Sequence, residues 1–201
     1  PWNPTANDFV RALAIKGDTV FAGGFFTRIG GRLLNNLAAL DSDVGSALPW
    51  DAGSDDAFVS SLVVQDNTLY VGGGFRRMGG QDRFGLAAID VTSGSARSWN
   101  PSPDSFVTSL CVGEGFVIAG GLFSAVGGQP HVGIVALDSR TGDPARWPAS
   151  SDGIVWSVAM AADALCYGGR FGAVGLFPAA NFAAVPLGRL GTDPPGIPAH
   201  V

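Results

Sequence analysis

The hydrophobic positions of this chain recur with a period of about 48 residues, which is the signature of a tandem repeat. Each period contains an apolar run, then a double glycine, then a phenylalanine. The apolar runs open at Phe9-Val10, Phe58-Val59, Phe106-Val107 and Ile154-Val155, the glycine pairs are Gly23-Gly24, Gly72-Gly73, Gly120-Gly121 and Gly168-Gly169, and the phenylalanines are Phe26, Phe75, Phe123 and Phe171. Each copy begins with a tryptophan, at Trp2, Trp50, Trp99 and Trp147. Glycine-rich turns separate the apolar runs, so each copy predicts four short strands and no helix longer than one turn.

The first strand of each copy is apolar on both faces. In copy 1, Val10, Ala12 and Ala14 alternate with Leu13 and Ile15. A sheet with one face in water would carry polar residues at alternate positions, so we expect both faces to be covered by neighbouring sheets. Radially stacked blades of a β-propeller meet this requirement, and paired glycines let neighbouring sheets approach closely. A β-sandwich with accidental symmetry is the alternative, but a sandwich has no reason to repeat at this period.

We therefore predict an all-β fold, a β-propeller of four tandem four-stranded antiparallel blades, over residues 1–188. The copies span roughly 2–49 (copy 1), 50–98 (copy 2), 99–146 (copy 3) and 147–188 (copy 4), and a Pro/Gly-rich tail follows at 189–201. A ring of four copies would close if Trp2 packed against copy 4, near Phe182 or Val185. In a fragment of a larger ring, Trp2 of one chain would instead meet copy 4 of another. The sequence leaves both alternatives open.

The repeat resembles the bacterial delta-60-type, kelch-like β-propeller family. The matching segments are Phe21-Ala22-Gly23-Gly24-Phe25-Phe26-Thr27-Arg28-Ile29-Gly30-Gly31, Leu37-Ala38-Ala39-Leu40-Asp41 and Trp99-Asn100-Pro101. The resemblance covers the chain up to about residue 188, and copy 4 departs most, since it lacks the second Gly-Gly and the Asp. It implies a propeller fold and a place in a large secreted or cell-surface bacterial protein. It supplies no catalytic residues.

The amino-acid composition limits the classes of protein and of partner that fit this chain. Hydrophobic residues make up 46% and charged residues 14%, which excludes a disordered chain. No apolar run approaches the roughly 18 residues that a membrane helix needs. The formal net charge is -5 and the basic residues are scattered, so a nucleic-acid partner is not expected. Cys111 and Cys166 lie inside apolar runs, which predicts reduced and buried thiols rather than a disulfide.

Two sets of residues recur in phase near the first strand. Oxygen-bearing side chains precede it at Asn7, Asp56, Asp104 and Asp152. If these gather at one mouth of a central channel, they suit a hard cation such as calcium, whereas the alternative is that each caps its own turn. The second set, on the strand itself, is Arg11, Ser60, Thr108 and Trp156. These vary while their neighbours stay apolar, so they are either ligand contacts or packing variants.

No catalytic residue is predicted, because the chain has two histidines and no nucleophile or phosphate-loop motif. Our hypothesis is a non-enzymatic binding or structural module of a larger secreted or surface protein, contacting protein or glycan through its loops. The alternative is a lyase or hydrolase acting at the channel mouth. Self-association is expected if the ring is incomplete.

Overall fold

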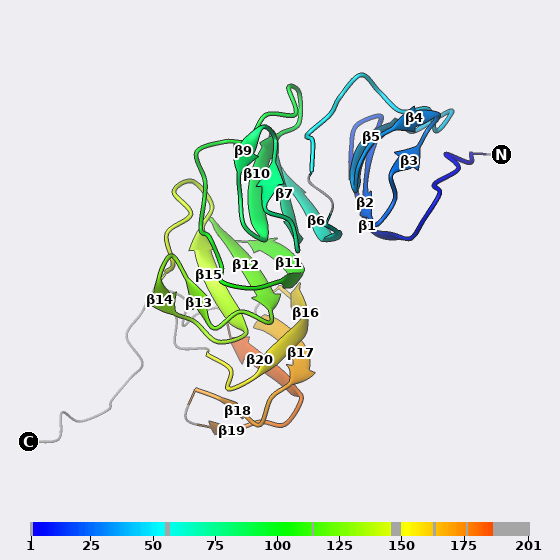
Figure 1. The fold of residues 1–201 in the computed structure, drawn as a ribbon. Helices are drawn as coiled ribbons and strands as arrows, with labels where there is room; N and C mark the ends of the chain where they lie inside the picture. The colour runs from blue at the N-terminus through cyan, green and yellow to red at the C-terminus, as the bar shows by residue number, and fades with distance from the viewer. Residues whose placement is uncertain are drawn as a thin grey trace, which may run out of the picture.

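The computed structural model describes residues 2–54, 57–113, 115–145, 150–162, 164–175 and 177–186, and all regular structure in them is β. Each copy forms a three-stranded antiparallel sheet with its second strand in the middle (Figure 1). The strands are β1 (Val10–Lys16), β2 (Thr19–Gly24) and β5 (Leu37–Asp41) in copy 1; β6 (Val59–Gln65), β7 (Thr68–Gly73) and β10 (Leu86–Asp90) in copy 2; β11 (Val107–Gly113), β12 (Phe116–Gly121) and β15 (Ile134–Asp138) in copy 3; and β16 (Ile154–Met160), β17 (Ala164–Arg170) and β20 (Phe182–Pro186) in copy 4. The described part of the chain contains no helix that could cross a membrane.

A two-stranded hairpin projects from each sheet where the sequence predicted only a turn. The hairpins are β3 (Arg28–Ile29) with β4 (Arg32–Leu33), β8 (Arg77–Met78) with β9 (Gln81–Asp82), β13 (Ala125–Val126) with β14 (Gln129–Pro130), and β18 (Ala173–Val174) with β19 (Phe177–Pro178). In copy 1 the turn is Gly30-Gly31, with φ of 58° and 82°. Two successive positive φ angles are what a tight hairpin turn requires, which explains the second glycine pair.

The prediction of four-stranded sheets is wrong in one respect, since the fourth strand is reduced to a single bridge. The bridges are Leu40↔Ala47, Ile89↔Ala96 and Leu137↔Pro144. Prolines stand at or shortly after these bridges, at Pro49, Pro101 and Pro144. A proline has no backbone N–H to donate, which limits the ladder at Pro49 and Pro144, but copy 2 has the same single bridge although its next proline is Pro101.

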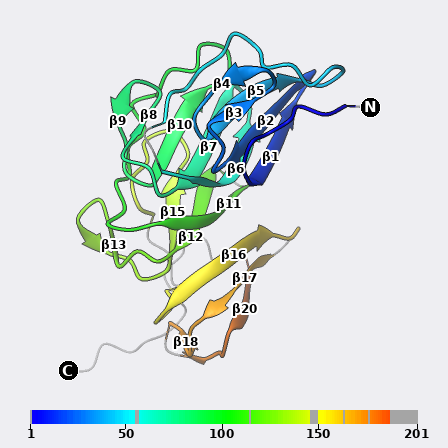
Figure 2. The same cartoon turned by 45° about the vertical axis from the view of Figure 1, so that its right-hand side comes forward.

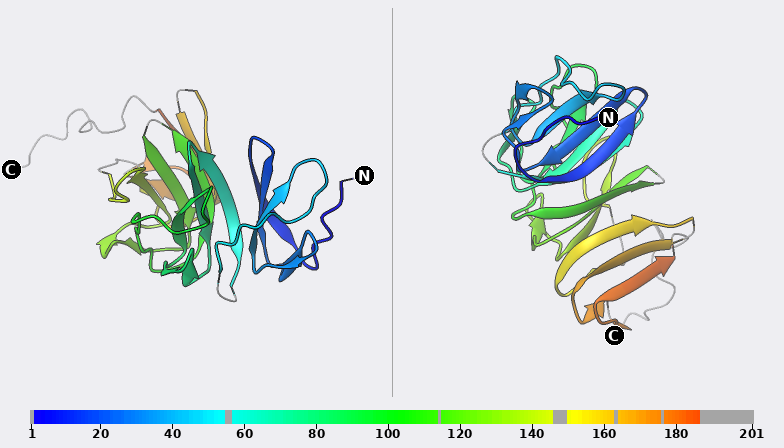
Figure 3. Two further views of the ribbon diagram at one scale, coloured as in Figure 1. Left: turned by 90° about the horizontal axis from the view of Figure 1, so that it is seen from above. Right: turned by 90° about the vertical axis from the view of Figure 1, so that its right-hand side faces the viewer.

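The four sheets follow one another in chain order as an open row. Strand β1 lies beside β6, β6 beside β11, and β11 beside β16, so the first strands are neighbours. Copy 1 and copy 4 lie at opposite ends of the row (Figures 1 and 2; Figure 3, right). The described residues form no closed ring, since the first strands are paired as neighbours only from one copy to the next.

Of the two alternatives left open by the sequence, closure of a four-copy ring by Trp2 on copy 4 is not seen in the described residues. Trp2 lies on copy 1, where its indole Nε1 donates to the carbonyl oxygen of Asp41 at 3.1 Å. The equivalent Trp99 shows the same bond to Asp138, at 2.9 Å, and also packs edge-on against Tyr70 of copy 2, with ring centroids 5.3 Å apart. Trp2 and Trp99 are thus each bonded to the copy that they begin, and Trp99 also covers the copy that precedes it, whereas the buried Trp50 indole N–H has no hydrogen-bond partner.

The hydrophobic core lies between the sheets. One buried cluster joins Phe21 and Leu37 of copy 1 to Trp50, Val59 and Leu62 of the next repeat. In copies 1 to 3 the first glycine of each pair faces the valine that opens the next first strand. A Cβ at Gly72 or Gly120 would lie 2.9 or 2.8 Å from the Cγ1 atom of Val107 or Val155, closer than packed atoms approach. The glycine pairs are therefore needed for contact between copies, as predicted.

Candidate functional site

Each first strand begins with a β-bulge. The register shifts between Val10 and Ala12 in copy 1 and at the same place in the other copies, so one residue of each strand has no partner. These residues are Arg11, Ser60, Thr108 and Trp156, the second set singled out in the sequence. A bulge turns its side chain away from the ladder, so these four side chains are free to serve another purpose.

Two of the four side chains connect neighbouring copies. The Ser60 hydroxyl lies 3.0 Å from the Gly72 carbonyl of its own sheet and 2.5 Å from the Val107 carbonyl of the next. Thr108 repeats this arrangement with Gly120 at 3.0 Å and Val155 at 2.7 Å. Ser60 and Thr108 therefore hold sheets together, whereas Arg11 and Trp156 are exposed.

A second pair of hydroxyls, which the sequence analysis missed, also joins the sheets. The Ser61 Oγ accepts a hydrogen bond from the Leu110 amide at 2.9 Å, and the Ser109 Oγ accepts one from the Val158 amide at 3.1 Å. Ser61, Ser109 and Ser157 recur in phase. That recurrence of a polar residue inside an apolar strand was the signal that would have found them.

The oxygen-bearing set is engaged within its own copies. Asn7 Oδ1 accepts from the Thr27 and Arg28 amides at 3.0 and 2.8 Å. Asp104 Oδ1 accepts from the Ser124 and Ala125 amides, and Asp152 Oδ1 from the Gly172 and Ala173 amides, all within 3.1 Å. These bonds join the segment before each first strand to the start of the hairpin about twenty residues later in the same copy, rather than capping the turn in which the residue stands. Asp56 lies outside the described residues.

These bonds also set the charge state of the two carboxyls. The Ser124 hydroxyl and amide, with the Ala125 amide, lower the pKa of Asp104 from its ordinary value of 3.8. The Gly172 and Ala173 amides do the same for Asp152. Among the described residues, no three His, Cys, Asp or Glu side chains come together as metal ligands. Calcium binding stays a prediction.

An aromatic row runs along the beginning of the first strands. Phe25 of copy 1 stacks on Phe58 of copy 2 with ring centroids 5.2 Å apart, and Phe58 meets Phe106 of copy 3 edge-on at 5.3 Å. The guanidinium carbon of Arg11 lies 5.8 Å from the centre of the Phe25 ring. We call Arg11, Phe25, Phe58 and Phe106 the aromatic rim. Phe25 and Phe106 are exposed.

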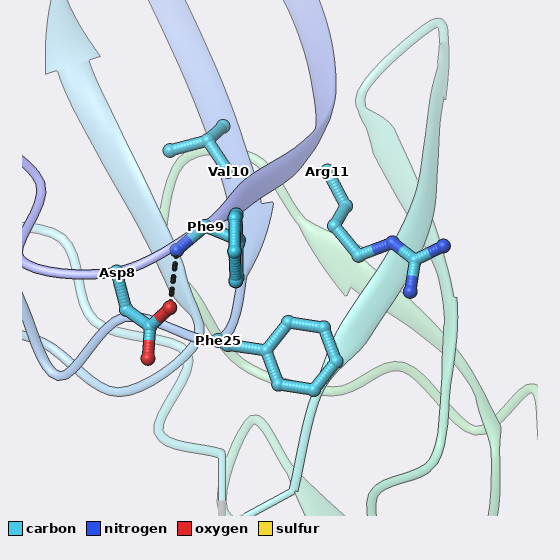
Figure 4. A pocket seen from close by; sticks show the side chains of 5 residues that line it. All are labelled: Asp8, Phe9, Val10, Arg11 and Phe25. Carbon is cyan, nitrogen blue, oxygen red and sulfur yellow. Dashed lines mark hydrogen bonds between the residues drawn. The ribbon is translucent and has the colours of Figure 1, made fainter.

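The rim begins in an open pocket. The pocket has a volume of about 540 Å³ and is lined by Asp8, Phe9, Val10, Arg11 and Phe25. Figure 4 shows the two phenyl rings and the Arg11 side chain around it, with the Asp8 carboxylate accepting from the Phe9 amide at 2.6 Å. It therefore offers two apolar faces, a cation and a carboxylate to a ligand, and Arg11 is the predicted contact residue that it contains.

A second depression, between copies 2 and 3, is less suited to a ligand. It is lined by Tyr70, Arg97 and Trp99 among others. The Tyr70 hydroxyl donates to the Ser139 carbonyl at 2.8 Å, and Arg97 pairs with Asp90 at 2.7 Å. The Tyr70 hydroxyl and the Arg97 guanidinium are thus occupied within the protein. The Arg11 guanidinium, by contrast, lies over the exposed Phe25 ring.

Both cysteines are free and partly buried, rather than fully buried as the sequence predicted. Burial raises the pKa of the Cys111 thiol to about 12. Cys166 occupies in copy 4 the position of Phe21 and Tyr70, the residues that pack against the next tryptophan. The end of the row leaves this position without a following copy.

Comparison with known proteins supports the fold only. No protein-family model and no curated protein sequence matches the chain. Two similar solved structures are computationally designed proteins: Ika4, with a TM-score of 0.63, 16% identity and coverage of 92% of this chain and 96% of that chain, and Ika8, with a TM-score of 0.55, 20% identity and coverage of 82% and 44%. The chain therefore spans less than half the length of the second. Its fold is an all-β repeat fold similar to that of designed β-propeller-like proteins.

Proposed function

We propose that this chain is a non-enzymatic binding module whose propeller-like copies present the aromatic rim to a protein or glycan ligand. The observation that supports this most directly is the continuous contact from Arg11 through Phe25 and Phe58 to Phe106, which crosses three copies. Side chains held by three rigid sheets lose little conformational freedom on binding, which favours affinity. Exposed apolar rings grouped at one edge are typical of an interaction surface.

The chemistry of the rim favours flat apolar ligand faces that carry polar substituents. Sugar rings and peptide side chains offer such faces to phenyl rings, and Arg11 beside Asp8 offers both a donor and an acceptor to their hydroxyl, amide or carboxylate groups. A place in a larger secreted or cell-surface protein is part of the proposal and rests on the resemblance of the repeat.

The test is a binding screen against immobilised glycans and peptides with matched variants. Phe25→Ala removes the ring that lies between Arg11 and Phe58, while Leu33→Ala removes an apolar side chain from the exposed hairpin strand β4, away from the rim. We expect any ligand bound by the wild type to be lost with Phe25→Ala and kept with Leu33→Ala. Retention of binding by Phe25→Ala would contradict the rim as the site. Release of cleaved ligand over time would favour the lyase or hydrolase alternative instead.

A further inference from the structure

The row of sheets ends in two apolar faces that complement each other. We propose that the copy 4 end of one chain binds the copy 1 end of a second copy of this chain, and that two chains close a ring of eight copies. The proposal goes beyond the ligand function of the aromatic rim, and its surface includes Phe9 and Val10, which also line the pocket at the start of that rim. Four kinds of contact made between neighbouring copies inside the chain have one half at copy 4 and the other half at copy 1.

The first of these contacts is that between glycine and valine. In the three inner junctions, Val59, Val107 and Val155 are 0% exposed against the glycines of the preceding copies, whereas Val10 is 41% exposed. At the other end, a Cβ on Gly168 would meet only the Asn181 carbonyl, at 3.6 Å. The space beside Gly168 is therefore empty, whereas a valine fills the equivalent space in the other copies. Val10 is the equivalent valine that has no glycine to pack against.

The second contact concerns the leucine of the first strand. Leu62, Leu110 and Val158 are 8%, 7% and 6% exposed, but the equivalent Leu13 is 60% exposed. The amides of Leu110 and Val158 donate to the serine of the preceding copy. Copy 4 carries that serine at Ser157, which is exposed. In the proposed interface Ser157 accepts from the Leu13 amide of the second chain.

The third contact concerns the tryptophan that covers the preceding sheet. Trp50 and Trp99 are 6% and 2% exposed, whereas Trp2, with no preceding copy, is 42% exposed. Its counterpart surface in copy 4 contains Phe182, which is 63% exposed while its equivalents Leu37, Leu86 and Ile134 are at most 3% exposed. Trp2 of one chain would cover Cys166 and Phe182 of the other.

A fourth contact would continue the aromatic rim. Phe25 of copy 1 stacks on Phe58 of copy 2, and the residue of copy 4 at the position of Phe25 is Arg170. The residue of copy 1 at the position of Phe58 is Phe9, which is exposed. Arg170 would therefore lie over Phe9 of the second chain, a cation–π pair like that of Arg11 and Phe25.

The occupant is a second copy because one chain carries both halves of these four contacts. A head-to-tail contact repeated between identical chains forms a ring when the rotation closes. The described arc superposes on less than half of the longer designed chain, so a fold of this type has room for as many copies again. The end faces at Val10 and Gly168 are then both buried.

The test is the molar mass of the whole chain in solution, measured by light scattering at about 50 μM. We expect twice the 20.5 kDa of one chain. Leu13→Asp at one face and Gly168→Ala at the other should each raise the dissociation constant of the dimer at least about tenfold, a typical loss at the centre of an interface. Both should keep the β circular dichroism spectrum, since Leu13 is exposed and a Cβ at Gly168 fits within the single chain.

The matched control is Leu33→Asp. Leu33 is exposed on β4, and its equivalents Asp82 and Pro130 stay exposed in copies 2 and 3, so the position faces no neighbouring copy. This variant should remain a dimer. Mixing the Leu13→Asp and Gly168→Ala chains should restore a two-chain species, because one of its two interfaces then has two wild-type faces. A wild-type mass of one chain, a higher multiple, or dimers that survive both substitutions would overturn the proposal.

Discussion

Replacing Trp99 by alanine tests the packing between copies most sharply. Trp99 is fully enclosed between copies 2 and 3, where it meets Tyr70 edge-on and donates to the Asp138 carbonyl. A buried aromatic removes about 150–250 Å² from water, which at about 25 cal/mol per Å² corresponds to about 4–6 kcal/mol as an upper limit. Measured truncations of buried aromatics cost about 3–5 kcal/mol, and we expect a loss in that range from the free energy of unfolding.

Trp2→Ala is the internal comparison, because Trp2 makes the same indole hydrogen bond but has no preceding copy to cover. Because 42% of the Trp2 surface is exposed, the Trp2→Ala substitution should lower the free energy of unfolding by about half as much, roughly 2 kcal/mol. Both variants are measured by urea unfolding followed by circular dichroism, in a Leu13→Asp background that keeps the chain monomeric. Equal losses for Trp2 and Trp99 would refute the reasoning, since Trp2 would then be as enclosed as Trp99.

Three further predictions follow from single contacts. Gly120→Ala should lower the free energy of unfolding by about 1–3 kcal/mol in urea titrations, because its Cβ meets Val155 at 2.8 Å; an unchanged midpoint would contradict the close approach of copies 3 and 4. Because the pKa of Asp104 is lowered on folding, its carboxylate stabilises the fold fully above the ordinary pKa of 3.8, and this stability is lost as the pH falls toward the lowered value. Asp104→Asn should therefore make the urea midpoint fall less steeply below pH 4. A thiol pKa of about 12 should leave Cys111 unreacted with iodoacetamide at pH 8 until urea unfolds the chain, as mass spectrometry of its peptide would show; rapid labelling of the folded chain would contradict its burial.

The local structure of each copy was largely predictable from the sequence. The glycine pairs and the turn positions depend on backbone sterics, which a single repeat unit determines. The expected cover on both faces is found for β2 and β5 and not for the first strand β1, which is largely exposed. The register bulge beside Val10 was not predictable, because a one-residue insertion leaves the apolar pattern of the strand almost unchanged. The same is true of the missing fourth strand, which is reduced to one bridge even in copy 2, where the next proline after Ala96 is Pro101.

The arrangement of the copies and most of the candidate site were not predictable. The angle between successive sheets depends on how side chains such as Trp50 and Val59 fit together, and small differences per copy decide whether four copies close. The aromatic rim depends on contacts across copies, from Phe25 to Phe58, which lie far apart in the chain. Arg11 was identified because the residue at its position in the repeat differs from copy to copy. The same signal also selected Ser60, whose hydroxyl joins two sheets.

The most direct test of the account is to image the purified wild-type chain by single-particle electron microscopy. The open row of four sheets and the complementary faces at Val10 and Gly168 predict class averages with eight lobes around a ring, made by two chains. The Leu13→Asp chain should give half of such a ring. A closed ring of four lobes from a single chain would contradict the open arrangement, and wild-type particles that remain open half rings would contradict the pairing of the two ends.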